Sequence, residues 1–224
     1  MRLRPAVVVL AGGLALAVGT PAVWAGTRPT TAAGPPLTSL IASSSATVPP
    51  PSVPRRAAAA SEPGVHPADP TPDTPVAAPV RLAVPEVGID APVDPVGVTP
   101  DGLLQLPDDV HRIGWYRFGP APGQSQGSVV LAGHVDSWNQ GLGVLSRLRW
   151  VGPGQRIAVT DVAGRVTTWQ VVTRQLVVKQ QLPLPELFTR AGPPRLVLLT
   201  CGGPFDERLR SYQDNLVVVA VPSP

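Results

Sequence analysis

The chain has 224 residues with 30 prolines, 22 glycines and one cysteine, and its formal net charge at pH 7 is +3. This length allows one ordinary domain with additional segments, and a single cysteine excludes an intramolecular disulfide. From residue 80 onward, 13 Lys and Arg stand against 12 Asp and Glu, a net charge of +1 with no basic run. Nucleic-acid binding is therefore not expected, because it needs a concentrated positive face.

The segment 1–26 is typical of an export signal or a membrane anchor. Arg2 and Arg4 precede an apolar run over 6–25, which as a helix is long enough to cross about 30 Å of hydrocarbon. We interpret 1–26 as a single-pass anchor with both arginines on the cytoplasmic side, so that the rest of the chain lies outside the cell membrane, in the cell envelope. Cleavage of this segment after Ala25 is the alternative.

Residues 27–79 have the composition of a disordered spacer. Thirteen prolines are mixed there with alanine, serine and threonine, and such a segment buries too little apolar surface to offset the conformational entropy of the chain. We expect it to be extended, and semi-rigid where prolines cluster. The remaining residues, 80–224, suffice for one sizeable hydrophobic core and are predicted to form the folded domain.

Short apolar runs rich in β-branched residues, with turn residues between them, fill the predicted domain. Two of them flank 161–164 (Asp-Val-Ala-Gly), which is typical of a β-hairpin. Helix signals are few: 143–148 and 184–190 each allow one or two turns, and prolines at 183 and 185 suit a helix start. Seven or eight strands predict an all-β barrel or sandwich. The runs cover residues 80–84, 89–98, 102–106, 128–132, 156–160, 166–178, 195–200 and 216–221.

Cys201 follows the apolar run 196–200 and precedes Gly202-Gly203-Pro204. We therefore expect the thiol at the end of a strand, where the chain leaves the sheet for a loop. Such a position suits a nucleophile, because the sheet holds it rigidly and the glycines let a substrate backbone approach. A small buried core residue is the structural alternative, and it describes most free cysteines.

His134 has a parallel setting, since it follows the run 128–132 and Gly133. Taken alone, His134 would be interpreted as a residue of a surface loop. We interpret His66 and His111 as surface residues. Imidazole can generate a thiolate near neutral pH or protonate a leaving amine. A cysteine and a histidine at two strand ends therefore indicate a Cys–His enzyme.

Two arginines, Arg208 and Arg210, lie in the predicted loop before the last strand. A guanidinium stays charged and offers a fork of donors, so either could hold a developing oxyanion or a substrate carbonyl. Solvated loop charge, paired with the acidic residues just before them, is the alternative. Asp136 could orient His134 as the acid of a triad, or it could cap a turn.

The residues around these positions resemble the sortase family. Leu199-Thr200-Cys201 is similar to the strand end that carries the cysteine in sortases, Gly133-His134 resembles the histidine motif, and the spacing from His134 to Cys201 is also similar. The wider segments 132–137 (AGHVDS), 199–206 (LTCGGPFD) and 211–215 (SYQDN) resemble the class E/F sortases, in particular the actinobacterial class F. The resemblance covers roughly residues 80–222.

The resemblance implies an eight-stranded β-barrel with one or two short helices, preceded here by the N-terminal hydrophobic helix and the Pro-rich spacer. It implies a cysteine transpeptidase: Cys201 attacks a peptide carbonyl in a sorting signal of the Leu-Pro-x-Thr-Gly (LPxTG) type of secreted surface proteins, and an amine of a peptidoglycan precursor or a pilin resolves the thioester. His134 would protonate the leaving amine, and Arg210, or alternatively Arg208, would be the catalytic arginine. The arginine matches least well, since some relatives carry it at the position of Gln213.

Three alternatives stay open at this point. A hydrolytic cysteine peptidase would release the same acyl group to water, and a non-catalytic barrel would only bind cell-wall peptide. An L,D-transpeptidase also uses cysteine and histidine, but this family resembles the chain less. It has an arginine two residues after the cysteine, and this chain has Gly203 at that position. No cofactor or metal site is predicted, since three separated histidines and one cysteine form no ligand cluster.

Overall fold

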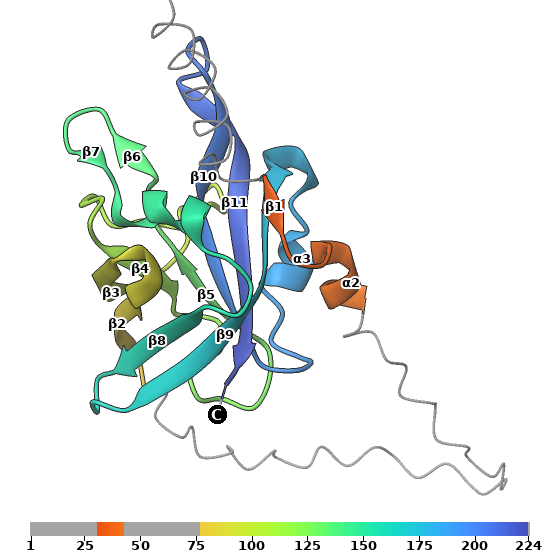
Figure 1. Cartoon of the computed structure of the whole chain (residues 1–224). Helices are drawn as coiled ribbons and strands as arrows, with labels where there is room; N and C mark the ends of the chain where they lie inside the picture. Colours follow the sequence, from red (N-terminus) through yellow and green to blue (C-terminus); the bar gives the residue numbers. More distant parts are fainter. Residues whose placement is uncertain (1–30, 43–76, 224) are drawn as a thin grey trace, which may run out of the picture. The chain divides into compact units, whose positions relative to one another are not determined.

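The computed structural model describes residues 31–42 and 77–223, and its core is a β-barrel. Eight strands follow one another around the sheet in the order β9-β11-β10-β5-β4-β3-β2-β8, and β8 pairs with β9 to close the barrel (Figure 1). The eight-stranded barrel predicted from the resemblance is thereby confirmed. The strands are β2 (Pro79–Val84), β3 (Ile89–Val96), β4 (Ile113–Tyr116), β5 (Ser128–Ala132), β8 (Arg156–Asp161), β9 (Val166–Val178), β10 (Arg195–Asp206) and β11 (Ser211–Pro222).

Two hydrophobic clusters lie on opposite faces of the sheet. One receives buried side chains from all eight strands, so it fills the barrel interior; in β10 these are Leu196 and Leu198. The other receives Val197 and Leu199, and its fully buried members come from β5, β10, β11 and two short helices, so it lies on the outer face. Because β5 and β10 are buried on both faces, their sequences are continuous apolar runs without polar alternation.

The helical signals are confirmed as short elements that close gaps around the barrel. The 3₁₀ helix η2 (Val144–Trp150) buries Leu145 and Leu148 in the interior cluster. The helix α3 (Leu184–Leu187) buries Leu187 in the outer cluster. The 3₁₀ turns η1 (Pro85–Val87) and η3 (Lys179–Gln181) complete the helical elements of the barrel among the described residues.

Several predicted boundaries are wrong. Residues 102–106 form no strand beyond a single bridge between Val98 and Leu104, because Thr99 closes a local turn through backbone and hydroxyl bonds to Leu103. The strand β4 was missed, since a short strand interrupted by a glycine gives little pattern. The small hairpin of β6 (Asp136–Ser137) and β7 (Gly141–Leu142) was missed for the same reason.

The last two strands are longer than predicted. β10 continues through Cys201 to Asp206, and β11 begins at Ser211, so a polar hairpin projects from the barrel (Figure 1). Cys201 consequently lies within a strand and not at a strand end. The apolar run ends earlier because β10 loses its neighbour β5 after Leu199, and from there on only β11 pairs with it.

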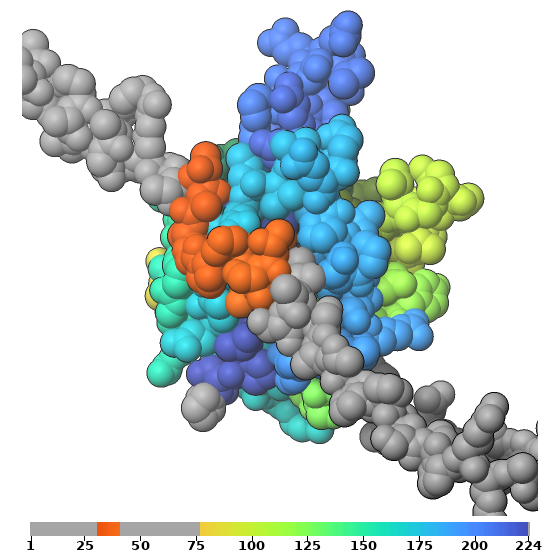
Figure 2. Space-filling view, turned by 90° about the vertical axis from the view of Figure 1, so that its right-hand side faces the viewer, coloured from red at the N-terminus to blue at the C-terminus, as the bar shows by residue number. Residues whose placement is uncertain are grey.

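Part of the predicted spacer is ordered structure. β1 (Ala32–Ala33) pairs with β9, and α2 (Leu37–Ala42) places Leu37 in the outer cluster with 4% of its surface exposed. Composition favoured disorder, but one buried leucine and the free edge of β9 hold this segment against the barrel (Figure 2). We refer to residues 32–42 as the N-terminal strap.

The predicted anchor over 1–26 and most of the predicted spacer lie outside the described residues. Within 31–42 and 77–223, none of the helices has both the length and the apolar character that a membrane-spanning helix needs.

Candidate active site

The parallel pairing of β5 with β10 gives His134 and Cys201 corresponding positions after two neighbouring strand segments. Every pair in this ladder, from Ser128 with Arg195 to Ala132 with Leu199, joins residues that are 67 positions apart. His134 and Cys201 are also 67 positions apart and come two residues after the last pair. Both side chains are half-exposed. The spacing that resembled the sortase motifs is therefore the register of two neighbouring strands.

Two hydrogen bonds carry this register past the end of β5. The backbone N–H of Gly133 donates to the carbonyl of Leu199 over 3.1 Å, and the buried hydroxyl of Thr200 donates to the carbonyl of Gly133 over 2.8 Å. A side chain at residue 133 would approach Leu145 to 3.1 Å, so glycine leaves room for η2 beneath the site. The residues that precede the histidine and the cysteine are thus tied together.

The backbone beside Cys201 is shaped by two glycines. A Cβ atom at Gly202 would lie 2.9 Å from Leu176, and one at Gly203, whose φ is +74°, would clash with Asp214. The pairing of β10 with β11 shifts between Gly202 and Phe205, which is a β-bulge. Such a bulge re-aims the strand, and here it begins directly after Cys201 and Gly202.

Asp136 does not bind His134 within the described part of the chain; it accepts a hydrogen bond from the hydroxyl of Tyr212. That bond, followed by burial and the negative charge of Asp136, raises the pKa of Tyr212 to about 12. The contact joins the loop after His134 to the projecting hairpin of β10 and β11. Asp136 is thus a satisfied carboxylate, and the described residues contain no triad hydrogen bond to it.

Arg210 and Arg208 occupy different places at the tip of the projecting hairpin. Arg210 lines a hollow of about 630 Å³ together with His134, and Arg208 does not. The turn is closed by the carboxylate of Asp206, which accepts hydrogen bonds from the backbone N–H groups of Arg208 and Leu209 over 2.9 and 3.0 Å. The backbone of Arg210 is left-handed with φ of 49°. We refer to this hollow as the His134 pocket.

Aromatic residues that the sequence analysis did not single out form walls of the His134 pocket. Phe205 and Tyr212 lie across the hairpin with ring centroids 5.1 Å apart, and Trp138 follows β6 with 91% of its surface exposed. The sequence held one signal for this wall, namely the two aromatic residues Phe205 and Tyr212 on either side of the predicted loop. The lining residues are Asp108, Val110, His134, Asp136, Ser137, Trp138, Phe205, Arg210 and Tyr212.

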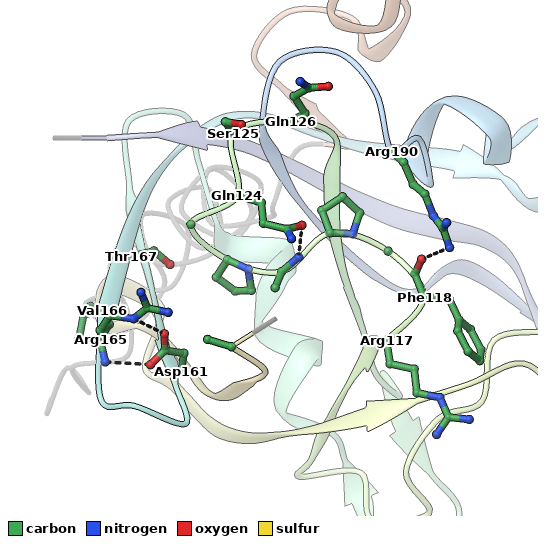
Figure 3. A pocket seen from close by; sticks show the side chains of 16 residues that line it. Arg117, Phe118, Gln124, Ser125, Gln126, Asp161, Arg165, Val166, Thr167 and Arg190 are labelled. Atoms are coloured by element: carbon green, nitrogen blue, oxygen red, sulfur yellow. Dashed lines mark hydrogen bonds and ion pairs between the residues drawn. The ribbon is translucent and has the colours of Figure 1, made fainter. Parts of the chain in front are cut away.

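A larger hollow, of about 1100 Å³, lies elsewhere and contains neither Cys201 nor His134. It is bordered by the loop that leads into β5, so it lies at the end of that strand remote from His134. Figure 3 shows that its polar groups bond mainly to one another: Arg165 to Asp161, Gln124 to the backbone of Ala121, and Arg190 to a backbone carbonyl. These bonds hold loops together, and we assign no chemistry to this hollow.

A closed eight-stranded β-barrel with a cysteine and a histidine at equivalent positions of two parallel strands is consistent with the class of β-barrel cysteine enzymes. The family model of the sortase domain matches residues 82–223, well over half of the chain. The chain therefore belongs to the sortase family, and it is a cysteine transpeptidase.

The chain is also similar, at low identity, to solved structures of sortases. Sortase C1 of Streptococcus agalactiae, in complex with MTSET, is 19% identical with a TM-score of 0.50, over 66% of this chain and 70% of that one. Sortase A of Corynebacterium diphtheriae, as a lid mutant, is 20% identical with a TM-score of 0.49, over 67% and 71%. Sortase C-1 of Actinomyces oris is 17% identical with a TM-score of 0.49, over 64% and 73%. Among curated proteins, none matches the chain.

Proposed function

We propose that this transpeptidase cleaves an LPxTG-like segment of secreted surface proteins, with Cys201 as nucleophile and His134 as general acid and base. The observation that carries the proposal is the shared offset of 67 positions, which extends the parallel ladder of β5 and β10 through the Thr200–Gly133 bond to these two residues. A thiol and an imidazole on adjacent strands can exchange a proton and serve one carbonyl between them.

The chemistry follows in two steps. The thiol proton of Cys201 passes to His134, the sulfur attacks the peptide carbonyl carbon, and the C=O electron pair moves to oxygen. When that oxyanion collapses, the C–N bond breaks and the leaving amine takes a proton from the His134 imidazolium. In the second step, neutral His134 removes a proton from an incoming amine, which attacks the thioester, and the cysteine leaves as thiolate.

We assign the catalytic arginine to Arg210 in preference to Arg208. Arg210 lines the His134 pocket and Arg208 does not, so its guanidinium is placed to hold a substrate carbonyl on the histidine side of the hairpin. Because a guanidinium is charged at every pH of interest, this contact would not vary with the protonation of the Cys–His pair.

The finer assignments rest on the sequence. The segments 132–137, 199–206 and 211–215 support membership of class E/F, and of class F in particular. The apolar run over 6–25 supports a single-pass membrane anchor with the catalytic domain in the cell envelope. The acceptor would then be an amine of a peptidoglycan precursor or of a pilin.

The experiment is mass spectrometry of the full-length chain, purified in detergent and mixed with an LPxTG-type peptide, with and without an added amine. A thioester on Cys201 and a peptide–amine product are expected. A thioester that yields only free acid would favour hydrolysis. If no peptide of a varied panel forms an adduct, while folding is intact, the sorting-signal assignment is wrong.

A further inference from the structure

The face of the sheet on which Cys201 lies follows from its neighbours. A Cβ atom at Gly202 would point at Leu176 and Leu216, and both of these pack with the interior cluster. Successive side chains of a strand point to opposite faces. Cys201 therefore points to the outer face, on the side of Val197 and Leu199.

The same alternation places two amide side chains on the outer face of β11. Leu216 pairs with Thr200 and is buried in the interior cluster. Asn215, one residue before it, and Gln213, three residues before it, therefore point outward with Cys201. Asn215 pairs directly with Cys201, which sets the Cβ atoms of such a pair about 4.5–5.5 Å apart, whereas Gln213 is the diagonal neighbour at about 7–8 Å.

The β-bulge leaves space for Gln213 to lean toward the thiol. Two residues of β10, Gly203 and Pro204, stand opposite Gln213 alone, and neither carries a long polar side chain. Gln213 is exposed, and its side chain forms no hydrogen bond within the described residues. An amide in this position can turn toward a group bound on Cys201 without first breaking an internal bond.

Arg210 lies at the hairpin tip, beyond the last pair of β10 and β11, and it lines the His134 pocket with Phe205 and Tyr212. The residues of β11 that point outward with Cys201 are the neutral amides Asn215 and Gln213.

We propose that Asn215 and Gln213 touch the substrate and donate hydrogen bonds from their side-chain N–H groups to the carbonyl oxygen of the peptide that Cys201 attacks. As the sulfur–carbon bond forms and the C=O electron pair moves to oxygen, these neutral donors stabilise the oxyanion and transfer no proton. The proposal rests on the proposed function in one respect, namely that Cys201 is the acylated nucleophile.

The test uses Asn215→Leu and Gln213→Met, which keep the approximate shape of each side chain and remove its donors. The probe is p-nitrophenyl acetate, whose acyl transfer to Cys201 in the full-length chain is followed by the release of p-nitrophenol, with Cys201→Ala as background. We expect each variant to acylate on the order of 10²-fold more slowly, the usual effect of removing one such donor. Gln170→Met, on exposed β9 surface, is the matched control and is expected to acylate at the wild-type rate.

A second readout separates substrate contact from a structural role. Alkylation of Cys201 by iodoacetamide builds no oxyanion, so its rate is expected to be unchanged in both variants. Equal acylation in wild type and variants would overturn the proposal, and so would a parallel loss of acylation and alkylation. If the ester acylates Cys201 but no peptide does, the sorting-signal assignment is wrong. The ester rates of the two variants would still decide whether Asn215 and Gln213 stabilise the oxyanion.

Discussion

The hydroxyl of Thr200 donates to the carbonyl of Gly133 over 2.8 Å, so the residue before the cysteine is bonded to the residue before the histidine. The bond is buried, since Thr200 exposes 4% of its surface. It extends the ladder of β5 and β10 by one step beyond the last backbone pair, and it ties together the two residues that precede Cys201 and His134.

Thr200→Val should destabilise the fold and slow acylation. Valine keeps the shape of threonine but leaves the Gly133 carbonyl buried without this donor, at a cost of about 1–3 kcal/mol in the free energy of unfolding. Denaturant titration measures that cost, and single-turnover acylation measures the loss of alignment. Thr200→Ser, which keeps the hydroxyl, should restore most of both. If Thr200→Val has the wild-type free energy of unfolding and the wild-type acylation rate, the bond does not align the segments that carry Cys201 and His134.

Cys201→Ala should abolish the acyl-enzyme while the barrel stays folded. The thiol is half-exposed and forms no disulfide, so its removal leaves no large cavity. Mass spectrometry with peptide checks for the adduct, and far-UV circular dichroism with thermal unfolding checks the fold. Full turnover in this variant would remove Cys201 from the mechanism.

Arg210→Ala should lower peptide turnover far more than Arg208→Ala. The two arginines have the same chemistry and lie in one turn, but only Arg210 lines the His134 pocket. Because the contact is proposed on the histidine side, the loss should appear in turnover of peptide with amine more than in ester acylation. The reverse order of the two variants would move the role to Arg208.

The barrel could be predicted because it rests on long apolar runs, and the prediction of Cys201 and His134 as site residues rests on the motifs beside these runs. The runs that became β5 and β10 are buried on both faces, so their signal was strong. That they pair in parallel was not visible in either run. It emerges only when the constant offset in the ladder is set beside the equal spacing of His134 and Cys201.

What the sequence missed depends on contacts between distant segments. The N-terminal strap has the composition of a spacer, and it is held by the edge of β9 and a hydrophobic site for Leu37. The extension of β10 beyond Cys201 is polar, and its strand structure depends on pairing with β11. The face of Gln213 follows from that pairing, so residue type alone could not assign it.

The bond between Tyr212 and Asp136 predicts a pH dependence in the alkaline range. The pKa of Tyr212 is raised to about 12 in the folded protein, above about 10 in the unfolded chain. Below pH 10 the phenol is protonated in both states and the stabilisation is fully present. As the pH rises from about 10 to 12, the unfolded chain loses its proton first, so the free energy of unfolding falls.

Tyr212→Phe should remove this dependence, because it has no phenolic proton to lose. The measurement is the difference in unfolding free energy between wild type and variant from pH 9 to 12, which cancels the titration of the groups common to both. A difference that stays constant across this range would contradict a native bond between Tyr212 and Asp136.

Leu37→Ala should lower the stability of the barrel although it lies outside the catalytic domain predicted from the sequence. Leu37 is buried with Leu187 and the outer side chains of β11, and truncating a buried leucine costs about 2–5 kcal/mol. Thr38→Ala, at the adjacent exposed position, should change the melting temperature little. If both variants melt like wild type in the full-length chain, the strap is not bound to the barrel in solution. A lower melting temperature for Leu37→Ala alone would show that the N-terminal strap is part of the folded domain, and that a catalytic fragment beginning near residue 77 lacks one of its stabilising elements.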